Sequence, residues 1–349
     1  MLTLLCALLL QQDLAAQVDE IVGKSVKPDG PGAAVLVMRG GDVLLKKGYG
    51  LASLEHRVPV TTATNFDMAS VSKQFTATAV MILADRAKLK FEDDVRTVLP
   101  ELPEFSRERP VRIEDLLHHT SGLPDYLNLL GKLPGDPDRL KNDDVLKLVA
   151  AEKLLFATGT KWAYSNTNYV LLALIVERLE KKSFGAFARE SIFEPLGMKN
   201  TVVFEDVSLV IPNRASGYQR TSKGAKAAHS DLTNTGDGAV FTSVDDWVRW
   251  ELELRKPTIV KAQTLARAWT SGKLDSGKEH GYGFGWAVGK RDGKLVVEHS
   301  GGWVGFLTFV TRAVDDGVTV AVFVNSTPGP DPASIARRIA KLVPARKEY

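Results

Sequence analysis

Apolar segments of strand-like length lie near both ends of this 349-residue chain, with helical periodicity between them. Residues 33–50 form two apolar runs around the turn Gly40-Gly41-Asp42, a pattern that predicts a β-hairpin. Further strands are predicted near the C-terminus, at residues 281–288, 294–299, 306–311 and 318–325. An isolated hairpin is at best marginally stable. The sequence therefore predicts one antiparallel sheet to which both ends of the chain contribute.

Between these two β regions, apolar residues recur at the spacing of one helix face. This pattern predicts helices at residues 70–83, 111–118, 143–153, 167–181 and 243–254. A further amphipathic helix is predicted at residues 331–342, after the last strand. Ser243 is typical of a helix start and Gly197 of a helix end. Two polar, glycine-containing stretches, 131–139 and 219–238, are predicted to be long surface loops.

Together these elements predict an α+β fold. An antiparallel sheet from both chain ends would be flanked by helices, with a mostly helical lobe inserted between its strands. The sheet lobe would comprise about residues 17–60 and 280–349, and the helical lobe about residues 61–279. This arrangement places a cleft between the two lobes.

The first residues differ in character from the rest of the chain. Leu2 to Leu10 is an apolar run too short to span a bilayer as a helix, and small residues follow at Ala15 and Ala16. This predicts a signal peptide over residues 1–16 and a periplasmic or secreted mature chain, residues 17–349. No Lys or Arg precedes the run, which departs from a complete signal peptide. A buried first helix is the alternative, although no helical pattern is recognised beyond the run.

Composition excludes several classes of function. The 45 basic and 42 acidic residues are interspersed and give a formal net charge of +3, so no nucleic-acid partner is predicted. No later stretch suits a membrane anchor, and no integral membrane segment is predicted in the mature chain. The single cysteine, Cys6, lies in the predicted signal peptide, which excludes a disulfide framework and a thiol nucleophile. The histidines lack zinc-ligand spacing, so neither a metal nor another cofactor is predicted.

Ser70 and Lys73 lie three residues apart at the start of a predicted helix. Residues at this spacing share a helix face, about 4.5 Å apart along the axis, whereas Ser72 is adjacent to Lys73 and points elsewhere. The pair suits a serine nucleophile with a lysine base, if the surroundings make the neutral amine accessible. A capping serine beside a solvated lysine would give the same pattern.

Two other segments carry groups suited to the same chemistry. Tyr164 and Asn166 are two residues apart before a predicted helix, which puts a proton-relaying phenol and an amide on one side of an extended segment. His299 ends a predicted strand just before glycines that would let a substrate approach the backbone closely. His299 is expected to face the cleft as a hydrogen-bond donor. The alternatives are a helix cap and core tyrosine in the first segment, and a turn with a solvated histidine in the second.

The joint order of these segments is more specific than any one of them. Ser-x-x-Lys, then Tyr-x-Asn, then His-x-Gly resembles the serine β-lactamase-like superfamily, on the branch of class C β-lactamases, D-alanyl-D-alanine carboxypeptidases, D-aminopeptidases and family VIII esterases. The stretches L-L-H-H-T-S-G-L-P-D-Y, G-D-G-A-V-F-T-S-V-D-D-W and G-Y-G-F-G-W are also similar to that family. The resemblance runs from about residue 32 to residue 325 and implies the β-lactamase/transpeptidase-like fold.

The resemblance implies a role for each matched residue. Ser70 would be the acylated nucleophile, with Lys73 and Tyr164 transferring protons and Asn166 holding the amide of the substrate. His299, Ser300 and Gly301 would form the wall of the site on a strand. The backbone N–H groups of Ser70 and Gly302 would form the oxyanion hole.

The third segment departs from the pattern of true class C β-lactamases, which usually carry Lys-Thr-Gly where this chain has His299-Ser300-Gly301. A lysine presents a permanent cation to the carboxylate of a β-lactam, whereas a neutral histidine offers only a donor. The sequence therefore favours a peptidase or esterase over an efficient β-lactamase.

The predicted function is hydrolysis of an ester or amide, peptide or β-lactam-like, through an acyl-enzyme on Ser70. A penicillin-binding sensor or scaffold of the same fold, without significant turnover, is the alternative. The partner is a small-molecule or peptide substrate whose identity the sequence does not fix, and the oligomeric state is not fixed either. Four aromatic residues are candidates either for a substrate wall or for the core between the lobes: Trp162, Tyr126, Trp286 and Trp303.

Overall fold

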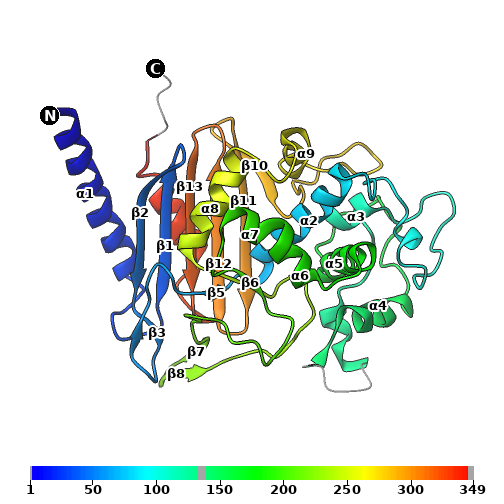
Figure 1. Ribbon diagram of the computed structural model, residues 1–349, viewed down its shortest axis with the longest axis horizontal. Helices are drawn as coiled ribbons and strands as arrows, with labels where there is room; N and C mark the ends of the chain where they lie inside the picture. The colour runs from blue at the N-terminus through cyan, green and yellow to red at the C-terminus, as the bar shows by residue number, and fades with distance from the viewer. Residues whose placement is uncertain (1, 133–138, 345–349) are drawn as a thin grey trace.

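The computed structural model describes residues 2–132 and 139–344, and within residues 2–11 it describes only the backbone. At its centre lies a six-stranded antiparallel sheet in the order β10-β11-β12-β13-β1-β2 (Figure 1). Its strands are β1 (Ala33–Arg39), β2 (Asp42–Tyr49), β10 (Ala287–Arg291), β11 (Lys294–Trp303), β12 (Phe306–Ala313) and β13 (Val318–Val324).

The two ends of the chain meet in the middle of this sheet, where β1 pairs with β13. Ala33 lies opposite Val324, and Arg39 lies opposite Val318. Both strands are buried along nearly their whole length. Strands covered on both faces need apolar side chains at successive positions, and both of these sequences supply them. The predicted α+β fold, with one sheet from both chain ends, is confirmed, as is the hairpin at residues 33–50.

Two of the predicted C-terminal strands differ from those in the structure. The predicted strand at 281–288 is mostly turns, and β10 begins only at its end, because Gly281 and Gly285 have φ values of +79° and +75°. An extended strand does not use this conformation. The predicted strand at 294–299 also ends too early, since β11 continues to Trp303.

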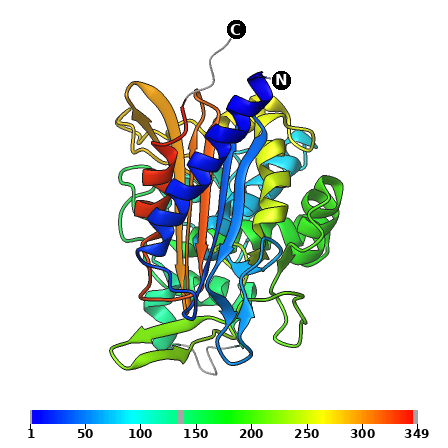
Figure 2. The ribbon, with the colours of Figure 1, turned by 90° about the vertical axis from the view of Figure 1, so that its left-hand side faces the viewer.

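Helices cover both faces of the sheet. On one face, α1 (Leu2–Gly23) and α10 (Pro332–Ala340) lie side by side (Figure 2). On the other face, α8 (Val244–Arg255) packs on β1 and β2, and the core continues from there into the helical region. The predicted helices at 243–254 and 331–342 are confirmed, and the Ser243 hydroxyl caps α8 by accepting a hydrogen bond from the Asp246 N–H.

The first helix extends well beyond the apolar run at its start. It continues to Gly23, and Val18, Ile21 and Val22 pack against the sheet in one buried cluster. This corrects the expectation that no helical pattern follows the run, because these side chains supply the spacing of one helix face. Among the residues that the structure describes, no helix combines the length and apolar character needed to cross a membrane.

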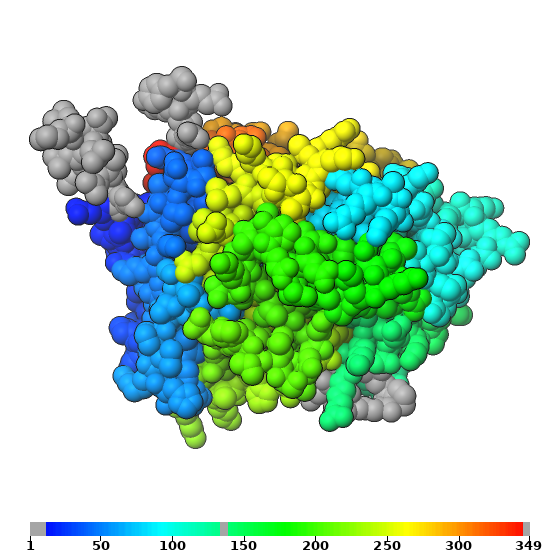
Figure 3. Space-filling view, viewed as in Figure 1, coloured from blue at the N-terminus to red at the C-terminus, as the bar shows by residue number. Residues whose placement is uncertain are grey.

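The helical region lies to one side of the sheet (Figure 1). Its helices are α2 (Lys73–Asp85), α3 (Ile113–Leu117), α4 (Asn142–Ala150), α5 (Asn166–Glu180), α6 (Phe184–Ala188), α7 (Glu194–Leu196) and α9 (Ala262–Ala268), with 3-10 helices at Ala69–Ser72, Val95–Thr97 and Tyr126–Lys132 and a π-helical turn at Arg189–Phe193. Figure 3 shows the green segments around α6 and α7 filling the space between the β2 side of the sheet and the cyan helical side.

The two predicted loops are only partly loops. The stretch 219–238 begins with a hairpin of β7 (Tyr218–Thr221) and β8 (Gly224–Ala227). Of the stretch 131–139, the first two residues end a 3-10 helix, and residues 133–138 lie outside the described part of the chain. The remaining strands form two small sheets: β3 (Leu51–Ser53) with β4 (Val58–Pro59), and β5 (Phe66–Asp67) with β9 (Val240–Thr242) and β6 (Val202–Val203).

Candidate active site

Ser70 and Lys73 are joined by a hydrogen bond where α2 begins. Ser70 lies in the 3-10 helix that precedes α2, and Lys73 is the first residue of α2 and is fully buried. Lys73 Nζ lies 3.0 Å from Ser70 Oγ. It also donates to Asn166 Oδ1 and to the backbone carbonyl of Asp237, both at 2.8 Å. The three donors of the ammonium group are therefore all used, which is how a buried lysine avoids an unpaired charge.

Ser72, the other serine of this segment, faces the protein interior. It is fully buried, and its hydroxyl accepts a hydrogen bond from the N–H of Val240. The helical spacing that favours Ser70 over Ser72 as the partner of Lys73 thus agrees with the structure.

The segment just before α2, residues 67–70, lies directly against strands β11 and β12 of the sheet. Thr308 on β12 donates its hydroxyl hydrogen to the carbonyl of Met68, and Asp67 accepts the N–H of Ala69. A Cβ atom on Gly301 would lie 2.3 Å from the Met68 carbonyl oxygen and 2.2 Å from Thr308 Oγ1. Real Cβ atoms do not approach this closely, so glycine at position 301 allows β11 to lie directly beside Ser70.

Asn166 is held between Lys73 and a carboxylate that the sequence analysis did not assign. Asp125 Oδ2 accepts hydrogen bonds from both the backbone N–H and the side-chain amide of Asn166, each at 3.0 Å. Asn166 is the first residue of α5, so Asp125 also places a negative charge at the N-terminus of that helix. The side-chain amide that is expected to hold the substrate is thus already hydrogen-bonded within the protein, through its oxygen to Lys73 and through its nitrogen to Asp125. Asp125 lies in the matched stretch 116–126, but nothing in the sequence pairs it with α5.

The ring of Tyr164 lies over the same lysine. Lys73 Nζ is 4.9 Å from the centroid of this ring, and the Tyr164 side chain is 36% exposed. The ring also packs against His119, with centroids 4.4 Å apart. The phenol hydroxyl makes no hydrogen bond to Ser70 or Lys73 in the described structure, so Tyr164 meets the lysine through its ring face.

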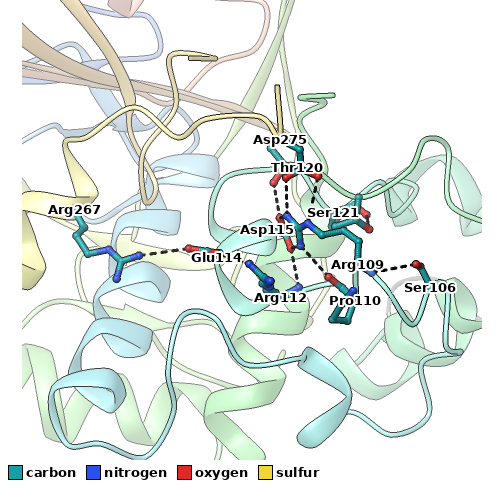
Figure 4. Close-up of polar contacts among 11 residues, drawn as sticks. Ser106, Arg109, Pro110, Arg112, Glu114, Asp115, Thr120, Ser121, Arg267 and Asp275 are labelled. Atoms are coloured by element: carbon teal, nitrogen blue, oxygen red, sulfur yellow. Dashed lines mark hydrogen bonds and ion pairs between the residues drawn. The ribbon is translucent and has the colours of Figure 1, made fainter. Parts of the chain in front are cut away.

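The turn that carries His119 is fixed by an ion-pair network (Figure 4). Arg109 donates two hydrogen bonds of 2.8 Å to the buried carboxylate of Asp115, which also accepts the Thr120 hydroxyl. Arg109 further approaches Asp275. Such a bidentate pair has a defined geometry. The network holds residues 115–120 in place and thereby positions the His119 ring, which packs against Tyr164.

His299 does not face the cleft as a free donor, contrary to the expectation from the sequence. Its Nδ1 lies 2.7 Å from the carbonyl oxygen of Ser300, and its Nε2 lies 2.8 Å from the hydroxyl of Tyr282. A carbonyl oxygen only accepts, so Nδ1 carries the proton and Nε2 accepts from Tyr282. Burial, and then the positive charge of Lys73, lowers the pKa of His299 to about 3. His299 is therefore neutral at physiological pH, with both ring nitrogens occupied.

A cavity of about 110 Å³ opens beside Ser70. Asn166 and Gly302 line it together with Ser70, so three of the predicted site residues meet at one cavity. The others do not line it: Lys73, Tyr164, His299 and Ser300. Of the four aromatic candidates, Tyr126 and Trp303 line the cavity, Trp286 is buried in the core and Trp162 is partly exposed elsewhere.

Two further polar residues in the cavity, Asp237 and Asn234, form a hydrogen-bonded group with Tyr126 and were not assigned from the sequence. Asp237 accepts hydrogen bonds from the Tyr126 hydroxyl at 3.1 Å and from the Asn234 amide at 3.2 Å. The Asn234 amide also donates to the Tyr126 oxygen at 2.9 Å. Asp237 lies in the matched stretch 236–247, but Tyr126 is 111 residues away in the sequence. The hydrogen bonds among Asp237, Tyr126 and Asn234 can therefore be seen only in the folded structure.

Among the described residues, no group of three His, Cys, Asp or Glu side chains is placed to hold a metal ion.

Comparison with known proteins identifies the family. The profile of the Beta-lactamase family matches residues 14–343, and the chain belongs to this family. The chain is 32% identical over 309 residues to Penicillin-binding protein 4* of Bacillus subtilis (strain 168), which covers 83% of this chain and 67% of that protein. It is 30% identical over 300 residues to a D-aminopeptidase of Gluconobacter oxydans (strain 621H), which covers 85% of this chain and 56% of that protein. The chain thus spans between half and about two thirds of the length of these relatives.

A solved structure shows the same fold. The octameric penicillin-binding protein homologue from Pyrococcus abyssi superposes with a TM-score of 0.80 at 26% identity, covering 93% of this chain and 75% of that one. The predicted resemblance to the β-lactamase-like superfamily is confirmed. Family membership and these relatives support a serine hydrolase of this fold in general terms.

Proposed function

We propose that this protein hydrolyses an ester or amide through a covalent acyl-enzyme on Ser70. The observation that carries the proposal is the 3.0 Å contact between Ser70 Oγ and the buried Lys73 Nζ, at the edge of a cavity. A serine is a weak nucleophile unless a neighbouring base accepts its proton, and lysine is the only basic side chain bonded to Ser70 in the described structure.

In the proposed first step, Lys73 has released one of its three ammonium protons to solvent, and its neutral amine takes the hydroxyl proton while Ser70 Oγ attacks the substrate carbonyl. The bond from Oγ to carbon forms, and the carbonyl oxygen becomes an oxyanion that the N–H groups of Ser70 and Gly302 would stabilise. The bond to the leaving alcohol or amine then breaks, and Lys73 or Tyr164 returns a proton to it. A water molecule then attacks the carbonyl carbon of the ester on Ser70, the bond from that carbon to Oγ breaks, one proton of the water returns to Oγ, and the acid is released. Lys73 Nζ lies 4.9 Å from the centroid of the Tyr164 ring, and this closeness supports a place for Tyr164 beside the base in the proposed proton transfer.

The surroundings of His299 support an esterase or peptidase rather than an efficient β-lactamase. A neutral ring with both nitrogens bonded supplies neither a cation nor a free donor for the carboxylate of a β-lactam. Slow acylation by penicillin, without rapid turnover, is consistent with this arrangement.

The test compares Ser70→Ala with Ser72→Ala, two serines of one segment with different surroundings. Ser70→Ala is expected to abolish both hydrolysis of p-nitrophenyl esters and labelling by a fluorophosphonate, because the attacking oxygen is lost. Ser72→Ala removes one buried hydrogen bond and is expected to leave labelling in place. Ester hydrolysis that persists in Ser70→Ala contradicts the proposal. Reversible binding of penicillin without turnover of any ester, peptide or β-lactam by the natural chain would instead favour a sensor or scaffold.

A further inference from the structure

The stretch L-L-H-H-T-S-G-L-P-D-Y contains a histidine that the proposed reaction does not use. His119 is fully buried, and its φ of +59° lies in the left-handed region. Few residues other than glycine adopt this conformation, and those that do are often found at active sites. The contacts of His119 show what this unusual backbone conformation provides.

His119 binds the chain immediately before and immediately after Tyr164. Its carbonyl oxygen accepts the N–H of Ala163 at 3.0 Å, and its ring nitrogen Nδ1 accepts the N–H of Ser165 at 3.3 Å. The rings of His119 and Tyr164 also pack together, with centroids 4.4 Å apart and an angle of 34° between their planes. One residue therefore fixes both the backbone and the ring of this tyrosine.

Two buried side chains determine which nitrogen of the His119 ring carries the proton. The Ser121 hydroxyl donates to Asn168 Oδ1 at 2.6 Å, which leaves the Asn168 amide nitrogen to donate to His119 Nδ1 at 3.2 Å. Because Nδ1 accepts from both Ser165 and Asn168, the proton lies on Nε2. Burial, and then the positive charge of Lys73, lowers the pKa of His119 well below its usual value, so the ring stays neutral.

The Tyr164 side chain has little else to hold it in place. It is 36% exposed, and its hydroxyl forms no hydrogen bond with another residue of the described chain. Such a side chain has several rotamers open to it unless packing selects one. The rings of Tyr282 and His299 lie 6.2 and 6.3 Å away, between centroids, so the His119 ring is closer than either. We therefore take His119 as the main restraint on the Tyr164 ring, whose centroid lies 4.9 Å from Lys73 Nζ.

We propose that His119 is a positioning residue, which holds the Tyr164 phenol beside Lys73 so that the phenol can protonate the leaving group of the substrate. This inference rests on the proposed function, in which Lys73 or Tyr164 returns that proton. In this step the bond from the carbonyl carbon to the leaving oxygen or nitrogen breaks, and the phenol proton passes to the leaving atom. The Lys73 ammonium, which received its proton from Ser70, then restores the phenol.

The test compares two esters whose leaving groups differ in their need for a proton. p-Nitrophenolate leaves p-nitrophenyl butyrate without protonation, whereas the alkoxide of ethyl butyrate has to be protonated as it leaves. His119→Asn keeps an acceptor on a short side chain and a residue type that tolerates positive φ, but it removes the ring. We expect its kcat/KM to fall at least about tenfold more for the ethyl ester than for the p-nitrophenyl ester, because general acid catalysis contributes about 10²–10⁴-fold. A residue with only a structural role would lower both values equally.

His118→Asn is the matched control, because His118 packs on Phe284 and bonds through Nδ1 to the carbonyl of Tyr282. It should leave the ratio of the two kcat/KM values unchanged. A second comparison adds His119→Asn to Tyr164→Phe. Where no phenol remains to be positioned, the ratio should not change further.

Equal losses on the two esters in His119→Asn, or the same change of ratio with and without the phenol, overturn the inference. A natural chain that hydrolyses the p-nitrophenyl ester but not the ethyl ester lacks a working acid, and this result overturns it as well. Ser70→Ala, measured in parallel, separates the two proposals. Hydrolysis of p-nitrophenyl butyrate that survives in Ser70→Ala contradicts the assignment of the nucleophile, whereas the ratio in His119→Asn tests only the positioning of the phenol.

Discussion

At the scale of single residues, this site shows how burial decides which form of a side chain is present. His299 and Asp237 lie close to the same lysine, and burial favours the neutral form of each. For His299 the positive charge of Lys73 acts in the same direction as burial, so the ring is neutral over the whole physiological range. For Asp237 the same charge opposes burial, so the carboxyl ionises above about pH 6. One ammonium therefore keeps a neighbouring base uncharged and a neighbouring acid charged.

The depressed pKa of His299 predicts a loss of stability on acidification. In the unfolded chain this histidine takes up a proton below about pH 6.5, whereas the folded chain resists protonation down to about pH 3. Stability from this group is therefore fully present above pH 6.5 and is lost as the pH falls toward 3. Between pH 7 and pH 4, His299→Gln should lose about 3 kcal/mol less unfolding free energy than the natural chain. Urea unfolding at both pH values measures this.

His56→Gln is the control for this experiment, because His56 is exposed in the turn after β3. It should follow the natural chain at both pH values. An identical acid-induced loss in His299→Gln and the natural chain would show that the ring is not held neutral by the fold.

At the scale of elements, the site depends on how closely β11 approaches the segment before α2. The predicted strand ended at residue 299 because glycines usually interrupt strands, but here Gly301 lies in the strand, directly against the backbone of Met68. Helical periodicity identified the Ser70 segment and α5 well, because local spacing controls both. It could not place Asp237, since this residue reaches Lys73 across 164 positions of the chain. Contacts of that range depend on packing rather than on local pattern.

Gly301→Ala should therefore separate the two elements. The added Cβ would lie within 2.3 Å of the Met68 carbonyl oxygen and of Thr308 Oγ1, both parts of rigid elements. Overpacking of this kind typically costs about 1–3 kcal/mol, and we expect both a lower melting temperature and slower fluorophosphonate labelling of Ser70. Gly289→Ala on β10 is the matched control, because no atom lies within 4 Å of its added Cβ. Equal melting temperatures for the two variants would contradict the proposed close contact.

At the scale of the whole molecule, the sheet is closed at one face by helices from opposite chain ends. The sequence pattern predicted α10 and a sheet shared by both ends of the chain, because these segments are apolar with clear periodicity. The pattern did not indicate that the apolar run at residues 2–10 continues as a helix to Gly23, since polar residues such as Gln11 and Gln12 interrupt the run before Val18. Seen in the fold, α1 combines two parts: an apolar start, and a later part that covers the sheet with Val18, Ile21 and Val22.

Cleavage after residue 16, as the sequence predicts, would leave Val18, Ile21 and Val22 in place, and truncation measures what these side chains contribute to stability. A chain that starts at Gln17 keeps all three packed side chains and should melt within a few degrees of the full chain. A chain that starts at Lys24 loses them, and removal of three buried aliphatic side chains should cost about 5 kcal/mol. That loss is comparable to the whole stability of many domains, so this form should be largely unfolded at 37 °C. Calorimetry of both forms provides the measurement. If the shorter form is as stable as the longer one, α1 does not contribute to the core as the structure indicates.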